Sequence, residues 1–143
     1  MLPLLLGAAT LLLGSACSGS PPRPSGHLVG ISLRDFGIAS STPVVHDGNV
    51  DFHIDNGSPS THEFVLVRSD LPADGLPISS DGLSADEDKI DHVGEISQVD
   101  TLTTQDLVLH LAPGRYIFFC NLEGHYLGGM HGVLEVSDDV QTS

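Results

Sequence analysis

The sequence is poor in basic residues, in cysteine and in methionine. Five Lys and Arg residues stand against 19 Asp and Glu residues, and the formal charge of the 143-residue chain is −14. Such a chain lacks the basic surface typical of nucleic-acid-binding proteins, so we expect no nucleic-acid partner. Two cysteines allow at most one disulfide, which excludes a small disulfide-rich scaffold. Met130 is the only methionine besides Met1.

A hydrophobic run of membrane-spanning length is also missing. The most apolar stretch, residues 2–13, is shorter than the roughly 20 residues that cross a bilayer as a helix. It has the length of the apolar part of a secretory signal, and small residues separate it from Cys17. This pattern resembles a bacterial lipoprotein signal, so we expect residues 1–16 to be a signal peptide and Cys17 to be lipidated. The alternative is an ordinary signal peptide cut after Ala16, which would give a soluble secreted protein.

Residues 17–26 are rich in Pro, Gly and Ser and show no apolar periodicity, which indicates a flexible tether. Such a tether would hold a lipid-anchored domain away from the membrane, at the periplasmic face of the cell envelope. We expect a single folded domain at residues 27–138 and a short tail at residues 139–143. The hydrophobic fraction of 40% is sufficient for a folded core.

Apolar residues in the expected domain recur at every second position. They alternate with polar or smaller residues at 29–33, 50–54 and 107–111, which is the period of strands with one buried face. Residues 115–120 form an almost continuous apolar run, typical of a strand buried on both faces. The Asp-Gly pair at 47–48 indicates a hairpin turn. Short strands separated by turns predict an all-β protein, a Greek-key β-sandwich with mixed strand pairing.

Residues 69–92, here called the acidic insertion, interrupt this pattern. They contain seven Asp and Glu residues and one lysine, and we expect a long surface segment with one short helical turn near residues 85–90. The simplest interpretation is a solvated loop that keeps the protein soluble, and a role in docking or steering a partner is the alternative. A calcium site around Asp86 and Asp88 is disfavoured, because their spacing matches no EF-hand loop.

Cys120, His125 and Met130 stand at equal spacing, C-x4-H-x4-M, between two expected strands. The loop can turn these three side chains toward one point, and His62, at the start of another apolar strand, can supply a fourth donor. A thiolate, two imidazoles and a thioether form the ligand set of a blue copper electron-transfer site. Structural zinc more often uses further Cys or His ligands, and calcium prefers oxygen. We therefore expect one mononuclear type 1 copper at these four residues.

Each of these residues also has an ordinary structural interpretation. A buried cysteine can be a small core residue, and a buried methionine can fill a gap in the core. Their common spacing favours the metal site. A nucleophilic Cys120–His125 pair is a third interpretation, but no orienting Asp or Asn and no oxyanion motif accompanies the pair, so we do not expect an enzyme.

Residues 27–137 resemble the cupredoxins, the family of small blue copper proteins. The resemblance rests on the motif at residues 61–64 (THEF) and on residues 111–130 (LAPGRYIFFCNLEGHYLGGM). The spacing within the second motif is closer to that of auracyanin, rusticyanin and sulfocyanin than to that of plastocyanin. The resemblance places the family's first His, Cys, second His and axial Met on the four residues named above. Glu63 departs from plastocyanin and azurin, which have Asn after the first His; a carboxylate there could lower the reduction potential or point to water.

By this resemblance, the chain is expected to transfer single electrons between redox partners. The family's apolar patch near the second His ligand implies a docking patch at Leu122, Tyr126 and Leu127. The negative charge favours a partner with a basic face, such as a cytochrome or a membrane oxidase or reductase, and we expect a monomer. The alternative is a periplasmic copper-binding or copper-delivery protein. Such carriers often use several Met or exposed His residues, whereas this chain has one internal Met.

Overall fold

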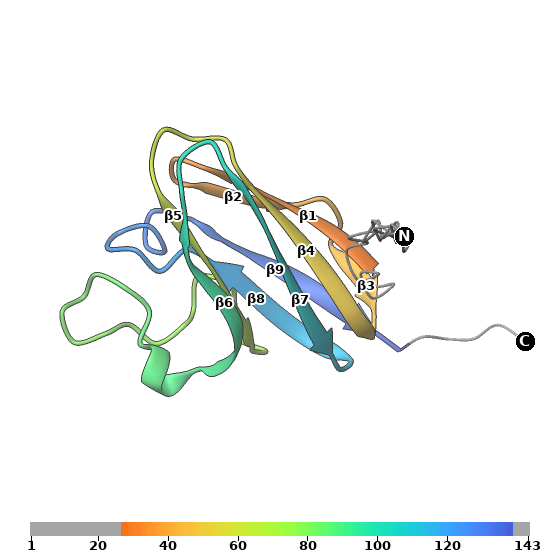
Figure 1. Ribbon diagram of the computed structural model, residues 1–143. Coiled ribbons are helices and arrows are strands. Elements are labelled where there is room, and N and C mark those ends of the chain that lie inside the picture. The colour runs from red at the N-terminus through yellow and green to blue at the C-terminus, as the bar shows by residue number, and fades with distance from the viewer. Residues whose placement is uncertain (1–26, 139–143) are drawn as a thin grey trace, which may run out of the picture.

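The computed structural model describes residues 27–138, which form two β-sheets packed face to face (Figure 1). The first sheet has the order β2-β1-β4-β7, with β1 (His27–Arg34), β2 (Gly37–Ser40), β4 (Gly48–Asn56) and β7 (Thr104–Leu111). The second has the order β3-β9-β8-β5-β6, with β3 (Val44–His46), β5 (His62–Arg68), β6 (Asp91–Val99), β8 (Gly114–Phe119) and β9 (His131–Ser137). The predicted all-β sandwich is confirmed.

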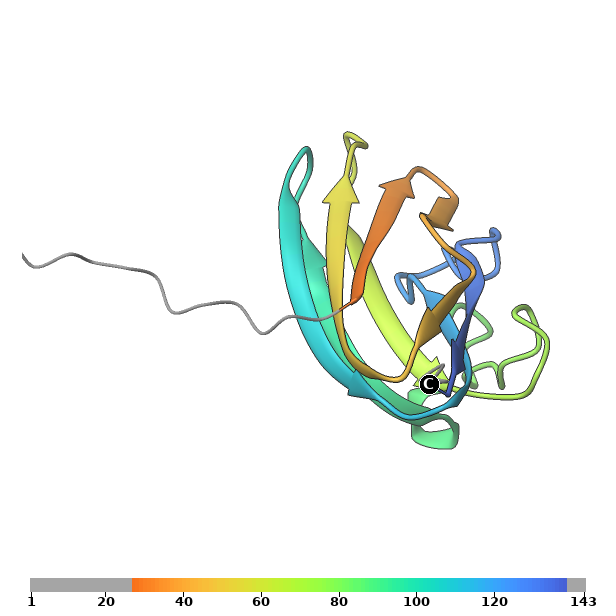
Figure 2. The ribbon, with the colours of Figure 1, turned by 90° about the vertical axis from the view of Figure 1, so that its right-hand side faces the viewer.

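Strand pairing is mixed, as the sequence predicts. β1 and β4 are parallel, and so are β3 and β9, whereas the other neighbouring strands are antiparallel. Figure 2 shows how the strands of both sheets curl around a shared interior. No helix within residues 27–138 is long and apolar enough to cross a membrane. The predicted signal peptide, the lipidation at Cys17, the tether and the tail lie outside the described residues.

The main core fills the space between the two sheets and follows the period-two pattern. The first sheet contributes fully buried side chains at alternating positions, namely Val29, Ile31, Leu33, Val50, Phe52 and Ile54. The second sheet faces them with Phe64, Leu66, Tyr116, Phe118, Leu134 and Val136. Because successive side chains of a strand point to opposite faces, this alternation fixes which face of each strand is turned toward the core.

The Asp-Gly pair at 47–48 does not form a hairpin, so this prediction is wrong. β3 pairs with β9 in the second sheet, and β4 pairs with β1 and β7 in the first. The turn instead carries the chain from one sheet to the other, with the Asp47 N–H donating to Ser137 O at 2.9 Å. Gly48 has φ of +110°, which suits glycine. The Asp-Gly pair does form a turn, but the strands that it joins belong to different sheets, because the partner of each strand depends on which sheet buries it.

The acidic insertion covers the outer face of the second sheet. The residues packed there form a second small core, made of Val65, Val67, Ile117, Phe119, Tyr126 and, from the insertion, Leu76 and Ala85. Residues 116–120 are therefore buried on both faces, as predicted for this run, whereas Arg115 at its start is partly exposed. The expected helical turn is present as the 3-10 helix η1 (Glu87–Lys89), and the last two residues of the insertion belong to β6. The insertion is thus packed against the sheet, which corrects the interpretation of a merely solvated loop.

Candidate metal centre

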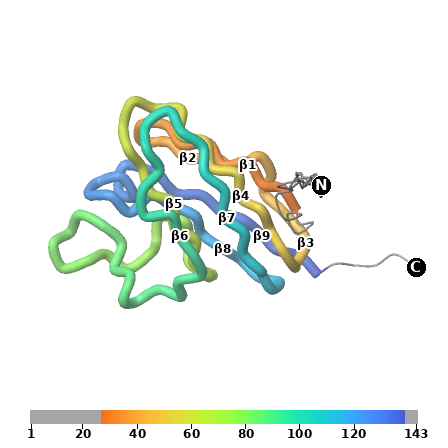
Figure 3. The backbone as a smooth tube through the Cα atoms, in the orientation of Figure 1, coloured from red at the N-terminus to blue at the C-terminus, as the bar shows by residue number. Residues whose placement is uncertain are grey.

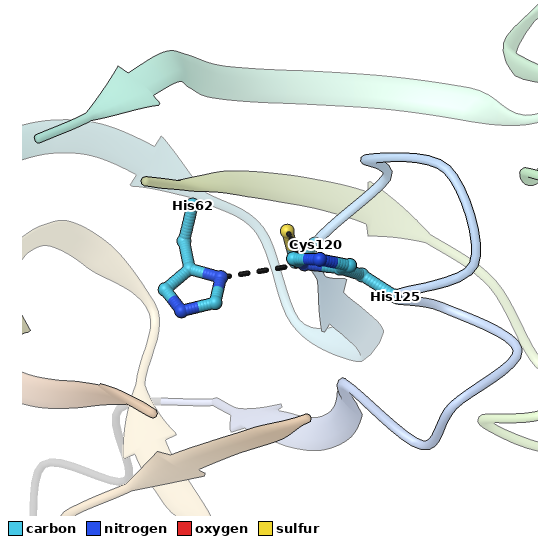
Figure 4. A group of neighbouring side chains, drawn as sticks. All are labelled: His62, Cys120 and His125. Carbon is cyan, nitrogen blue, oxygen red and sulfur yellow. Dashed lines mark hydrogen bonds between the residues drawn. The ribbon is translucent and has the colours of Figure 1, made fainter. Parts of the chain in front are cut away.

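Three of the four predicted ligands converge on one point (Figure 4). His62 begins β5, Cys120 directly follows β8, and His125 lies in the loop between β8 and β9. The Nδ1 atoms of His62 and His125 are 3.3 Å apart, and Cys120 Sγ lies 3.4 Å from His125 Nδ1. The donor atoms of the three residues all lie within 4.8 Å of one another. The other six histidines are not part of this cluster.

Met130 is tied to this cluster through its backbone and is itself fully buried. Its N–H donates to His125 O at 3.0 Å, and its carbonyl accepts from the Cys120 N–H at 3.1 Å. These two bonds close the segment from residue 120 to residue 130, here called the ligand loop. Gly124 and Gly129 adopt positive φ values of +78° and +101°, which let the loop turn back sharply. The even spacing seen in the sequence therefore corresponds to a closed loop.

His62 is completely buried, and its outer nitrogen has polar neighbours. Its Nε2 lies 2.8 Å from Ser58 Oγ and 3.6 Å from Asp35 Oδ1. Burial, followed by the neighbouring His125, lowers the pKa of His62. The ring is consequently neutral at neutral pH, which is the form that binds a metal.

Cys120 is also completely buried, and it accepts a hydrogen bond from the Glu63 backbone N–H at 3.3 Å. Burial raises the pKa of the Cys120 thiol. A thiolate at this place therefore needs a nearby cation, and a bound metal ion would supply that charge. The converging donors are two nitrogens and one sulfur, with a buried thioether in the same loop. This set fits copper and does not fit calcium or magnesium, which prefer oxygen ligands.

His125 has a different environment from His62. It is only half-buried, and the ring of Phe36 packs against it with a centroid separation of 5.5 Å. Phe36 lies in the two-residue turn between β1 and β2, has a positive φ of +55° and is 62% exposed. No sequence motif points to Asp35, Phe36 or Ser58, because none of them belongs to the ligand motif and only the fold brings them to the histidines.

The predicted docking residues separate into three environments. Leu127 is 53% exposed, whereas Leu122 is half-buried and packs against the main core. Tyr126 is only 1% exposed, so its prediction as a docking residue is wrong. Its hydroxyl donates to Ala73 O and accepts from the Leu76 N–H, both at 2.9 Å. Tyr126 points away from solvent because it joins the ligand loop to the acidic insertion.

Two further residues of the ligand loop hold the insertion. The Asn121 side chain accepts from the Ala85 N–H at 2.8 Å and donates to the Glu87 carboxylate at 2.6 Å. The Gly124 N–H donates to Leu83 O at 2.8 Å. Figure 3 shows the insertion running beside the loop between β8 and β9. The insertion is therefore attached to the segment that carries three of the four predicted ligands.

Glu63, the residue after the first predicted ligand, is half-buried. Burial, together with the nearby carboxylates of Glu87 and Glu95, raises its pKa to about 7. The side chain thus does not simply point to water, and its charge changes near neutral pH.

Comparisons with known proteins agree with this architecture. No protein-family model matches the sequence, and neither does any curated protein. Among solved structures, dithionite-reduced auracyanin of Roseiflexus castenholzii is 24% identical, with a TM-score of 0.56 over 79% of this chain and 98% of that chain. Auracyanin A of Chloroflexus aurantiacus, described as a "blue" copper protein, is 20% identical, with a TM-score of 0.51 over 77% and 99%. Rusticyanin of Thiobacillus ferrooxidans is 17% identical, with a TM-score of 0.50 over 79% of each chain. The predicted cupredoxin fold is confirmed.

Proposed function

We propose that this protein carries single electrons through one type 1 copper ion. In this proposal the Cys120 thiolate and the imidazoles of His62 and His125 are the three strong ligands, and Met130 is the weak axial ligand. The observation that carries the proposal is the convergence of two imidazole Nδ1 atoms and a buried thiol within 4.8 Å. Trigonal sites of this composition with a weak Met are electron-transfer sites in proteins.

A bound copper ion supplies the redox couple, since it alternates between the Cu(I) and Cu(II) states. The chain contributes the geometry. His62 and Cys120 lie at the ends of two paired strands, β5 and β8, and both are fully buried. A close-packed interior resists displacement, so these donors change position little between the two oxidation states. The same enclosure favours electron transfer over copper delivery, because a delivered ion must leave the site easily.

Electrons are proposed to enter and leave through His125, the more exposed of the two histidines. Three exposed apolar residues lie on or beside the ligand loop that carries it. Phe36 contacts its ring, Leu127 is two residues further along the ligand loop, and Leu83 lies where the insertion is bonded to Gly124. An apolar surface beside a redox centre suits a transient protein partner, which must dock and dissociate repeatedly.

The partner is proposed to present a basic face. Within residues 27–138, the four basic side chains already interact with neighbouring groups. These contacts are Arg34–Asp55 at 3.4 Å, Lys89–Asp86 at 2.6 Å, Arg115–Glu135 at 3.5 Å, and Arg68 with Pro113 O at 2.8 Å. The remaining acidic charge would attract a cationic cytochrome or membrane oxidase from a distance. Export, with lipid anchoring at Cys17, is part of the same proposal and would place the protein beside such partners.

The first experiment is an optical and EPR spectrum of the copper-loaded protein. We expect an intense thiolate-to-Cu(II) band and a blue or green colour, and Cys120→Ser should abolish both. A colourless copper-loaded protein would overturn the type 1 assignment. Rapid loss of Cu(I) to a weak chelator would favour copper delivery instead.

The second experiment measures the electron-transfer rate with a basic and an acidic test cytochrome across ionic strength. The rate with the basic cytochrome should fall as salt rises, because charges are screened over about 8 Å at physiological salt. Replacing the exposed Asp74 and Asp88 of the insertion with Asn should reduce this dependence more than replacing Asp47 and Asp138, at the other end of the sandwich. Equal rates for both cytochromes at every salt concentration would remove the steering proposal.

Anchoring is tested by fractionation of cells that produce the full chain. The wild type should be found with membranes, and Cys17→Ala should release it. A soluble wild type would favour simple secretion.

A further inference from the structure

The outer nitrogen of His62 has two polar neighbours that do not belong to the ligand set. Ser58 Oγ lies at 2.8 Å and Asp35 Oδ1 at 3.6 Å from His62 Nε2. Ser58 lies in the loop between β4 and β5 and is 3% exposed. Asp35 lies in the turn between β1 and β2. Two separate segments therefore approach one nitrogen of a fully buried ring.

The hydrogen bonds of Ser58 indicate which partner donates. A hydroxyl has one hydrogen and two lone pairs. The Ser58 hydroxyl donates to Ser60 O at 3.0 Å and accepts from the Ser60 N–H at 3.2 Å. One lone pair is left, and it can accept a hydrogen bond from His62 Nε2. A carboxylate such as that of Asp35 offers acceptor oxygens. The Ser58 hydroxyl is thus satisfied when the hydrogen of the His62 ring is on Nε2, and the Asp35 carboxylate, at 3.6 Å, favours the same form through its charge.

We propose that Ser58 and Asp35 are positioning residues that hold His62 in the tautomer with hydrogen on Nε2. The Nδ1 lone pair then points at His125 and Cys120 before any metal arrives. Metal binding at this histidine requires no proton transfer and no ring rotation. The purpose of this arrangement rests on the proposed metal site, but the tautomer itself is a property of the metal-free protein.

The loop around Ser58 has further hydrogen bonds besides the two that the Ser58 hydroxyl makes with Ser60. Asn56 is completely buried, and its side-chain amide donates to Ser60 O, Val99 O and Asp100 O. Its carbonyl oxygen accepts the Ser58 N–H at 3.1 Å. These bonds hold the backbone of the loop, so Ser58→Ala should remove the contact with His62 and leave the loop in place.

Asp35 should also act through its charge. A carboxylate near His62 stabilises the more positive Cu(II) form of the site and so lowers the reduction potential. The next residue, Phe36, packs against His125. One two-residue turn therefore contacts both proposed imidazole ligands from outside the ligand motif.

The direct test is nitrogen NMR of the imidazole rings in the metal-free protein. The wild type should show a protonated Nε2 and a bare Nδ1 at His62. Ser58→Ala should give a mixture of tautomers, and Ser58→Thr, which keeps the hydroxyl, should restore the wild-type state. A wild type with hydrogen on Nδ1, or a Ser58→Ala spectrum identical to it, would overturn the proposal. This measurement uses no metal, so its failure is separate from a failure of the proposed function.

A second measurement follows metal binding by optical titration with Co(II). Loss of a partner that orients a metal-binding histidine typically weakens affinity by about tenfold or more, and we expect this for Ser58→Ala but not for Ser58→Thr. Asp35→Asn should raise the reduction potential of the copper form. Asp70→Asn, at an exposed position in the insertion, is the control for loss of one negative charge. Equal potentials for the two Asn variants, with affinity unchanged in Ser58→Ala, would contradict the positioning role.

Discussion

The two predicted histidine ligands lie in contrasting parts of the molecule. His62 begins a strand of the second sheet, is fully buried and contacts Ser58 through its outer nitrogen. His125 lies in the ligand loop, is half-buried and packs against an exposed Phe36. The first environment holds a donor in place, and the second brings a donor close to the surface. One centre can thus be enclosed and still accessible to a partner.

The contrast extends to what supports each side. The His62 side depends on the sheet and on the Asn56 bonds, which link β4 to the loop before β5 and to the end of β6. The His125 side depends on the ligand loop and on the acidic insertion bonded to it through Asn121, Gly124 and Tyr126. A segment that interrupts the strand pattern in the sequence thereby becomes a support for the site.

Removing each imidazole should separate the two sides most clearly. His125→Gly opens a gap near the surface, and added imidazole should restore the charge-transfer band there. His62→Gly opens a gap within the core, where external imidazole enters poorly. Restoring the band should therefore require an imidazole concentration at least about tenfold higher than for His125→Gly. Optical titration of both variants with imidazole checks this, with circular dichroism as the control for folding. Equal recovery would mean that the two sides are equally accessible.

Replacing the proposed axial ligand should raise the reduction potential while copper stays bound. Met130→Leu keeps the buried volume similar but removes the weak thioether donor, which favours Cu(I) because that state needs fewer ligands. We expect the reduction potential to rise by about 60 mV, a tenfold change for one electron. Protein-film voltammetry measures it. A lower potential in this variant would show that Met130 is not the axial ligand.

Cutting the link between loop and insertion should have a smaller effect. Tyr126→Phe removes one hydroxyl and leaves the Leu76 N–H without that partner, which should cost about 1–3 kcal/mol of unfolding free energy. Denaturant unfolding of the metal-free protein and hydrogen exchange at Leu76 measure the loss. Tyr116→Phe is the matched control, since the Tyr116 hydroxyl bonds to Ala112 O outside the insertion. If both variants expose Leu76 equally, the hydroxyl of Tyr126 is not what holds the insertion.

The smallest expected effect is a pH dependence from Glu63. Its pKa is raised from 4.5 to about 7, chiefly by burial and then by Glu87 and Glu95, while His92 acts in the opposite direction. Between these two values the folded protein retains a proton that the unfolded chain releases, so stability falls as pH rises through this window. Allowing for partial exposure, the free energy of unfolding of the metal-free protein should fall by about 1–2 kcal/mol between pH 5 and pH 8. This fall should be absent in Glu63→Gln. Denaturant unfolding at both pH values measures it, and an equal loss in both proteins would exclude Glu63.

Much of the candidate site could be predicted because its donors are chemically distinctive and lie close together in the chain. Cys120, His125 and Met130 belong to one closed loop, and short-range spacing largely decides where such side chains can meet. The fold class was equally accessible, since the period-two alternation reports one buried face for each strand. The prediction for Tyr126 was wrong because an aromatic residue in a loop can face either solvent or a neighbouring segment, and the sequence does not say which.

The β-sandwich, the donor types and the strongly acidic character of the protein could therefore be predicted from its amino-acid sequence. Each of these depends on local periodicity, on the chemistry of single side chains or on composition. Three other features depend on the folded chain as a whole: the Asp-Gly turn crosses between sheets, the insertion supports the ligand loop, and Asp35, Phe36 and Ser58 lie beside the histidines. Those contacts join residues from separate segments, and their formation depends on how the two sheets and the insertion pack. Packing depends on the whole chain at once, which is why no local pattern carries it.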